Sequence, residues 1–290
     1  MRQAFISEEF KSKIQRLQEQ FAPRIAKLQP VINSDFPELI VTAPDEWDSI
    51  ELAPLYDVHK GSGEHDSELF DKHHEWIKKK PNVLWFNGGD MVENANPSSP
   101  GASVMVQKGT PNEQLYAAAT DLADIQHKML FAIPGNHEDR TFNVSGMDGA
   151  QTLAEFLRVP YYPDYAFVTI RWRGQNFRLL AHHGSGAAQT PGAQRNAARK
   201  DMPWAHFDIF WTGHLHQPMA DVVYQIDHDQ ATGLAFERNA VVIISPSYVK
   251  YFGGYAAKKR MAPGNRGLTA VTLQPDGRID VSLHARGRRL

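Results

Sequence analysis

The residues that follow the predicted strands constrain this chain more than any other feature of its sequence. Short apolar segments with the length of strands lie at 50–56, 82–86, 130–133, 177–181 and 207–211. Asp, Asn or His follows each of these segments within a few residues. Because ligands of open α/β sheets bind at the carboxyl ends of the strands, we expect these polar side chains to gather at one edge of a sheet.

The polar segments are rich in residues that bind metal ions. In chain order they are Asp57-Val58-His59, Gly88-Gly89-Asp90, Gly135-Asn136-His137-Glu138, His182-His183-Gly184 and Gly213-His214-Leu215-His216. Each is weak alone, since Asp-x-His is common in surface turns and Gly-Asn-His-Glu also fits a turn with a left-handed Asn. Gly-His-x-His is stronger, because alternate residues of an extended segment share a face. Together, and always after strands, the segments predict a metal site.

The composition of this set restricts the metal. The candidate ligands are Asp57, His59, Asp90, Asn136, one of His182 and His183, His214 and His216. Oxygen and nitrogen donors without sulfur suit Mn, Fe or Zn better than Ca, and they disfavour copper. Seven ligands exceed the four of a structural zinc site. They suit two divalent ions that share a bridging carboxylate, at a separation of roughly 3.5–4 Å.

The remaining patterns predict a layered α/β domain. Helices are expected at 68–79, 112–129, 149–157 and 191–200, and further strands at 166–172, 220–226, 240–244, 268–273 and 278–283. Strands that alternate with helices and then give way to mixed strands are typical of a layered α/β fold. At the N-terminus, apolar spacing predicts a helix over 8–28 that Pro23 breaks or kinks. Pro30, Pro37 and Pro44 then indicate a loop-rich connector.

Composition and charge bound the compartment and the partners. The chain has 290 residues and no cysteine, which excludes disulfides, thiolate metal sites and cysteine nucleophiles. This fits a cytoplasmic protein, and no apolar run approaches the length of a membrane span. Residues 258–290 have a net charge of +6, which leaves −8 for the rest of the chain. Such a segment either attracts phosphate-bearing partners, nucleic acid among them, or is a solvated surface.

The ordered set of Asp-x-His, Gly-Asp, Gly-Asn-His-Glu, His-Gly and Gly-His-x-His resembles the calcineurin-like metallophosphoesterase superfamily. The resemblance implies a four-layer α/β/β/α sandwich over 46–290, preceded by an N-terminal helical extension over 1–45. It also implies that the first metal is held by Asp57, His59 and His216, the second by Asn136, His214 and one of His182 and His183, and that Asp90 bridges both. His137 would protonate the leaving oxygen or stabilise the phosphoryl group, oriented by a carboxylate neighbour.

Two positions remain open within this assignment. Successive strand residues point to opposite faces, so at most one of His182 and His183 faces the metals. The superfamily often places the ligand directly before a glycine, which selects His183, whereas a His-x-Pro alignment selects His182. The other histidine, like Arg140, would contact substrate or support a ligand.

The sequence also departs from part of the superfamily. Its protein serine/threonine phosphatases have an Asp-Arg pair where this chain has Glu93-Asn94, so the arginine that grips phosphate is missing. The motifs look more like those of phage-type and prokaryotic members. The resemblance implies phosphate-ester hydrolysis by a metal-bridged hydroxide, best supported by Mn²⁺ with Fe or Zn as alternatives.

The substrate and the oligomeric state stay open in the sequence. The basic segment favours phosphodiesters, nucleotides or nucleic acids, and a phosphomonoesterase acting on a small molecule is the alternative. A non-catalytic protein-binding scaffold of the same fold is disfavoured, because His137 and all ligand positions are present. A metallo-β-lactamase-like hydrolase is disfavoured because its His-x-His-x-Asp-His cluster is absent.

Overall fold

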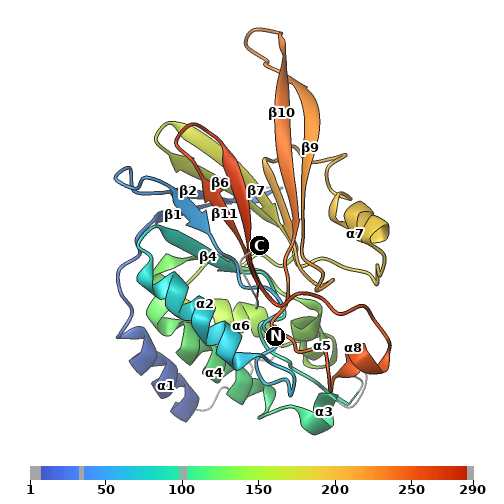
Figure 1. Cartoon of the computed structure of the whole chain (residues 1–290). Coiled ribbons are helices and arrows are strands. Elements are labelled where there is room, and N and C mark those ends of the chain that lie inside the picture. The colour runs from blue at the N-terminus through green and yellow to red at the C-terminus, as the bar shows by residue number, and fades with distance from the viewer. Residues whose placement is uncertain (1–7, 33–35, 98, 100–102, 286–290) are drawn as a thin grey trace.

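The computed structural model describes residues 8–32, 36–97, 99 and 103–285, and two sheets dominate it (Figure 1). The larger sheet contains, in spatial order, β1 (Lys27–Ile32), β2 (Pro37–Thr42), β6 (Ala166–Trp172), β7 (Gln175–Ala181), β8 (Ile209–Thr212), β10 (Ala235–Ile244) and β9 (Met219–His228). The pairs β2–β6, β7–β8 and β8–β10 are parallel. The other pairs are antiparallel, so the sheet is mixed.

The smaller sheet carries the first three of the predicted strands. Its order is β12 (Ile279–Ala285), β11 (Gly267–Leu273), β3 (Ile50–Leu52), β4 (Val83–Asn87) and β5 (Met129–Ala132). Strands β3, β4 and β5 are parallel, so their carboxyl ends meet at one edge. All residues of β4 and β5 are buried, as expected for strands covered on both faces.

Helices cover the outer face of each sheet. Buried side chains of α1 (Glu8–Gln18), α2 (Ser67–Lys79), α4 (Pro111–Leu122), the 3₁₀ helix η1 (Ala123–Lys128) and α6 (Gly149–Leu157) form one core with the smaller sheet. Helix α7 (Pro191–Ala198) packs on the outer face of the larger sheet. The helices α3 (Ser103–Val106), α5 (Asn136–Ser145) and α8 (Tyr255–Lys258) lie near one end of that sheet (Figure 1). The layers are therefore α/β/β/α, as the sequence predicted.

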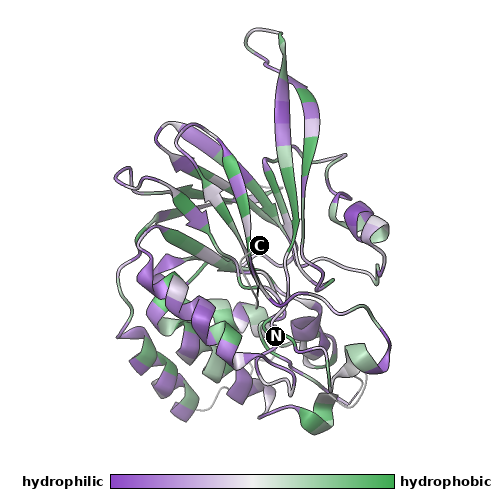
Figure 2. Cartoon of the chain, viewed as in Figure 1, coloured by the Kyte–Doolittle hydropathy of each residue, from purple (hydrophilic) through white to green (hydrophobic). Residues whose placement is uncertain are grey.

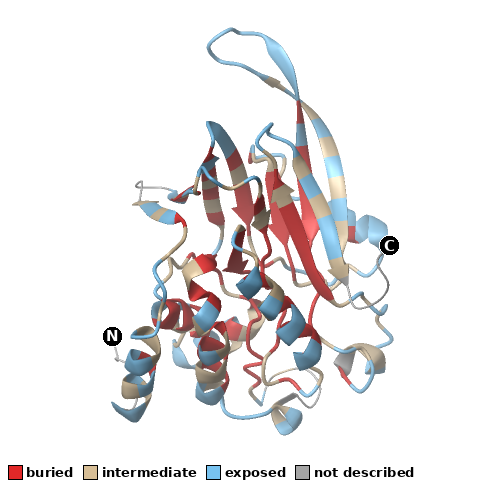
Figure 3. Ribbon diagram, turned by 60° about the vertical axis from the view of Figure 1, so that its left-hand side comes forward, coloured by how far each residue is buried: buried red, intermediate tan, exposed pale blue. Residues whose placement is uncertain are grey.

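The two sheets share a core of aromatic and aliphatic side chains. Phe86 of β4 stacks on Phe131 of β5 with ring centroids 4.5 Å apart, and Trp211 of β8 meets Phe86 edge-on at 5.8 Å. The strands carry most of the hydrophobic residues and the helices are mixed (Figure 2). Most of the buried residues lie on the central strands, whereas the projecting hairpin of β9 and β10 is largely exposed (Figure 3). Among the described residues, no helix is long and apolar enough to span a bilayer.

The expected elements are confirmed in most of the chain, and α6 and β6 have the predicted bounds. The helix expected over 8–28 is wrong beyond Gln18, and Leu28 lies in β1. Pro23 prevents the helix from continuing to residue 28, because proline cannot donate within a helix. After it, the Ile25 amide donates to the carbonyl of His127 at 3.1 Å.

The loop-rich connector expected around the three prolines is also wrong. Strands β1 and β2 form a hairpin, and β2 pairs in parallel with β6. Proline is tolerated there because Pro37 is the first residue of its strand and β1 is an edge strand. The helical description of the N-terminal extension therefore applies to residues 8–18 alone. The division of the chain at residue 45 stays a prediction.

Candidate metal centre

The candidate ligands lie where the backbone turns sharply at the ends of strands. Among the described residues, few non-glycine residues have positive φ, and five of them are candidate ligands: Asp57 (51°), His59 (50°), Asp90 (52°), His214 (64°) and His216 (54°). Left-handed backbone costs free energy for residues with a Cβ atom, and such strain gathers at functional sites. The fold therefore holds these side chains in conformations that an unconstrained chain avoids.

Two glycines allow the backbone to approach the carboxylates. A Cβ atom on Gly135 would lie 2.1 Å from Oδ1 of Asp90. A Cβ atom on Gly213 would lie 2.6 Å from Oδ2 of Asp57. These distances are too short for real atoms, so the glycines of Gly-Asn-His-Glu and Gly-His-x-His are required by the packing of the site.

The first group of candidate ligands joins Asp57, His59 and His216, whose ligand atoms lie within 4.8 Å of one another. Nε2 of His216 is 3.0 Å and Nε2 of His59 is 3.9 Å from Oδ1 of Asp57. The other carboxylate oxygen of Asp57 accepts the backbone N–H of His214 at 2.9 Å. That hydrogen bond ties the loop after β8 to the loop after β3.

The second group consists of Asp90, His183 and His214, whose ligand atoms also lie within 4.8 Å of one another. Nε2 of His183 lies 3.4 Å from Oδ2 of Asp90. Nδ1 of His214 lies 2.7 Å from Oδ1 of Asn136, the first residue of α5. The amide of Asn136 is therefore close to the second group, as the sequence predicted.

Asp90 lies between the two groups. Its Oδ2 is 3.7 Å from Nε2 of His59 and 3.4 Å from Nε2 of His183. The backbone N–H of His137 donates to Oδ1 at 2.8 Å, which fixes the carboxylate. A single oxygen of Asp90 thus lies within 4 Å of a histidine from each group. Oδ1 of Asp57 also reaches both groups, at 3.0 Å from Nε2 of His216 and 4.0 Å from Nε2 of His183.

The donor atoms fit divalent metal ions. Nε2 of His59 and Nε2 of His183 are buried and have no hydrogen-bond partner. Nδ1 of His183 lies 2.9 Å from the carbonyl oxygen of Gly88 and donates to it, so in the neutral ring Nε2 carries the lone pair that a metal ion would bind. A buried nitrogen without a partner costs about 1–3 kcal/mol, and a metal ion would satisfy both of these atoms.

The electrostatics of the site also call for positive charge. Burial disfavours the charged imidazolium of His183, but the carboxylates of Asp90 and Asp57 outweigh it and raise its pKa to about 10. Burial likewise opposes the charge of Asp57, but His216, His59 and His183 hold its pKa well below its usual range. The carboxylates are therefore anionic, and the positive charge of the neighbouring imidazoles stabilises them.

His137 lies at the edge of both groups. Its ring centroid is 4.3 Å from that of His59, and its Nε2 is 3.8 Å from Oδ2 of Asp90. Nδ1 lies 2.7 Å from the carbonyl oxygen of Glu93 and 3.6 Å from the carboxylate of the same residue. Arg140, one turn along α5, places Nη2 2.7 Å from Nε2 of His137.

The two adjacent histidines that follow β7 point to opposite faces of the sheet. His183 belongs to the second group, whereas Nε2 of His182 lies 2.9 Å from Oδ2 of Asp201. The ring of His182 packs 5.1 Å from that of Tyr165, on the side of α7. The structure thus brings His183 into the centre and leaves His182 outside it.

Two glutamates of the centre were not among the candidate residues from the sequence. Glu138 is buried and accepts the N–H groups of Asp90 at 3.0 Å, Gly135 at 2.9 Å and Met91 at 3.0 Å. Glu93 places Oε2 3.3 Å from Nδ1 of His59. A signal for Glu138 exists, because a glutamate in the third position of a helix often accepts the N-cap amide.

Two arginines of the basic segment have acidic partners within the chain. Arg266 is paired with Asp66, and Arg278 lies 3.5 Å from Asp280. Arg286, Arg288 and Arg289 lie outside the described residues. Residues 261–265 pack against the centre instead, since a Cβ atom on Gly264 would lie 2.0 Å from the carbonyl oxygen of His216.

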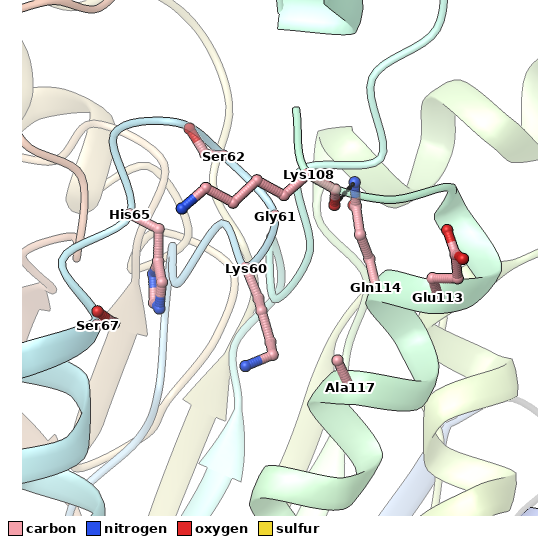
Figure 4. A pocket seen from close by; sticks show the side chains of 9 residues that line it. All are labelled: Lys60, Gly61, Ser62, His65, Ser67, Lys108, Glu113, Gln114 and Ala117. Carbon is pink, nitrogen blue, oxygen red and sulfur yellow. Dashed lines mark hydrogen bonds between the residues drawn. The ribbon is translucent and has the colours of Figure 1, made fainter. Parts of the chain in front are cut away.

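A cavity of about 330 Å³ opens beside the loop that carries His59 (Figure 4). Its lining includes Lys60, Ser62, His65, Lys108 and Gln114. The Lys60 ammonium is paired with Asp121, and the Gln114 side chain is bonded to the backbone of Asn94 and Gly109. The polar groups of this cavity are thus largely occupied within the protein.

Comparison with known proteins agrees with this geometry. A search of curated proteins finds no match. The model of the calcineurin-like phosphoesterase family matches residues 57–251, about two thirds of the chain and the whole span from Asp57 to His216. The chain therefore belongs to the calcineurin-like phosphoesterase family, whose members are metal-dependent hydrolases of phosphate esters.

Proposed function

We propose that the centre holds two divalent metal ions and hydrolyses phosphodiesters. Asp57, His59 and His216 would hold one ion, and Asn136, His183 and His214 the other. Asp90 would bridge them. The observation that carries this proposal is the pair of buried, unpartnered Nε2 atoms of His59 and His183 on either side of the Asp90 carboxylate.

When bound, such a pair of ions polarises the phosphoryl group and lowers the pKa of a water molecule into the neutral range. The protein supplies the positions. Glu93 orients His59 through Nδ1, and the carbonyl of Gly88 orients His183. These contacts leave Nε2 of each ring as the donor atom for a metal ion.

His137 would carry a proton on Nε2 for the leaving oxygen once Arg140, which donates to that nitrogen here, has turned away. Its Nδ1–H donates to the carbonyl of Glu93, so Nε2 is the atom that faces the centre. The guanidinium of Arg140 lies against this nitrogen and would turn to a phosphate oxygen when substrate binds. Arg140 would then partly replace the arginine that the Glu93-Asn94 stretch lacks.

A phosphodiester, with nucleotides or nucleic acid as the class, is the substrate that we propose. The support is the basic end of α8 and the turn after it, where Lys258 and Arg260 precede the segment packed against His216. The set of oxygen and imidazole donors supports Mn²⁺ as the native ion, with Fe or Zn as alternatives. The lack of cysteine supports the cytoplasm as the location.

The test is hydrolysis by metal-stripped protein to which one metal is added back. We expect no turnover without metal, the greatest recovery with Mn²⁺, and faster hydrolysis of bis-p-nitrophenyl phosphate than of p-nitrophenyl phosphate. Asp90→Asn should lose nearly all turnover. Full activity after metal removal would contradict the metal assignment, and a preference for the monoester would contradict the substrate class alone.

A further inference from the structure

The hairpin of β9 and β10 projects beyond the rest of the larger sheet (Figures 1 and 3). Strand β9 is the last strand of that sheet, and all ten of its residues pair with β10 without a bulge. Its outer edge therefore offers a continuous row of backbone N–H and C=O groups. A long, regular edge is a template for pairing with another strand.

One face of this hairpin is apolar and exposed. Val222, Tyr224 and Ile226 are 64%, 56% and 66% exposed. Val222 lies directly opposite Val241, which is buried in the core between the two sheets. The exposed row is thus a continuation of the face that packs against the second sheet, carried past the point where that sheet ends.

On the opposite face of the hairpin, side chains of β9 already contact other parts of the chain. Val223 packs against the core beside α7. Asp221 is paired with Arg199 and lies 3.4 Å from Arg195. At the distal end, Nη1 of Arg238 lies 3.6 Å from Asp227. The apolar row is therefore the uncovered face, and the charges of β9 are neutralised within the same chain.

Edge strands that must stay single usually carry lysine, proline or a bulge, which block the approach of a second strand. Strand β9 reads Met-Ala-Asp-Val-Val-Tyr-Gln-Ile-Asp-His and contains no lysine, arginine or proline. Its two acids are paired with arginines of the same chain. Nothing in this strand repels another strand of the same sequence.

We propose that β9 pairs with β9 of a second copy of this chain, antiparallel about a two-fold axis. A strand without repelling charges, with neutral residues at its centre and a matching apolar row, is self-complementary in this orientation. Residues directly opposite each other in antiparallel strands have their side chains on the same face of the sheet. The apolar rows of the two copies therefore meet only when the two-fold axis passes between one residue and the same residue of the second copy. Because it is the distal half of the hairpin that projects, the axis lies near the middle of β9, at Val223, Tyr224 or Gln225.

The absence of cysteine provides a direct test. Single cysteines are introduced at positions 223, 224 and 225 of the full chain, and the protein is oxidised at low concentration. A residue on the axis faces its own copy, and opposite Cα atoms of paired strands lie within the distance that a disulfide spans. We expect one of the three variants to cross-link as a dimer much faster than the other two.

The matched control is Leu234→Cys, at the exposed tip of the same hairpin. The tips of two antiparallel hairpins point away from each other, so this variant should not cross-link. Equal cross-linking of Leu234→Cys and the three central variants would overturn the proposal, because it would show random collision.

The mass of the protein in solution tests the same proposal without cross-linking. Light scattering after size exclusion should show a dimer, and Tyr224→Lys should weaken dimerisation at least about 10-fold. In each of the three registers the two introduced lysines lie opposite each other or two residues apart, so their like charges repel across the axis. Phe236→Lys is the control, because Phe236 is exposed on the other face of the same hairpin. A monomer at every concentration, or a dimer that Tyr224→Lys leaves unchanged, would overturn the proposal.

Discussion

Nε2 of His183 lies 3.4 Å from Oδ2 of Asp90, is buried, and has no hydrogen-bond partner. Its neighbour along the chain, His182, points to the opposite face of the sheet and contacts Asp201. A step of one residue directly after β7 therefore separates a nitrogen that faces the candidate metal centre from one that lies on the side of α7.

Metal content separates the two histidines. His183→Ala should reduce the bound metal from two ions towards one per chain, because it removes a nitrogen donor from the second group. His182→Ala is the matched control and should keep both ions. Metal content is measured by elemental analysis after dialysis, and the reverse pattern would assign the ligand to His182.

The leaving group should decide how much His137 matters. His137→Asn should retain both metals and lose about 10²–10⁴-fold in kcat on esters with a basic alkoxide leaving group, which needs a proton from an acid. The loss on nitrophenyl esters should be much smaller. If both substrates lose the same factor, His137 stabilises phosphoryl charge instead, and loss of metal would make it a ligand.

Glu138 should act through the position of Asp90. In Glu138→Gln the amide NH₂ meets the N–H groups that the carboxylate accepted, so the loop of Asp90 should shift. Loss of such a supporting contact typically weakens metal affinity about 10–100-fold. Titration of metal into stripped protein measures this, with the exposed Glu155→Gln of α6 as the control. Unchanged affinity would mean that the loop holds its shape without Glu138.

His73 should make the fold sensitive to acid. Burial, with His284 and Lys72 nearby, lowers the pKa of His73 to about 4, and its Nδ1 lies 2.9 Å from the hydroxyl oxygen of Tyr248. The unfolded chain therefore binds more protons between about pH 6.5 and 4, and the free energy of unfolding falls as the pH drops through that range.

A non-titrating variant isolates this effect. His73→Gln should lose up to about 3 kcal/mol less stability than the wild-type chain between pH 7 and 4, at 1.36 kcal/mol for each unit of pKa shift. Denaturant unfolding at several pH values measures the difference. The exposed His228→Gln is the control and should follow the wild-type curve. Parallel curves for His73→Gln and the wild type would show that His73 is not responsible.

Much of the fold follows from local patterns that the sequence displays. The hairpin of β6 and β7 flanks Arg173 and Gly174, both with positive φ, and turn residues of this kind can be recognised without a structure. At the N-terminus, the prolines and the apolar spacing led to wrong predictions, because the pairing of β2 with β6 joins residues far apart in the chain. Such pairing depends on contacts that no local window contains.

The residues that could bind metal were determined by the sequence, because the order of the motifs after strands limits which side chains can meet at the edge of a sheet. Only the tertiary structure decided between His182 and His183, and only it brought Glu93 and Glu138 to the centre. The physical reason is that ligand type is a property of each residue, whereas orientation depends on strand register. The backbone of Asp90 and the ring of His59 are held by residues from other loops, and tertiary packing alone sets those distances.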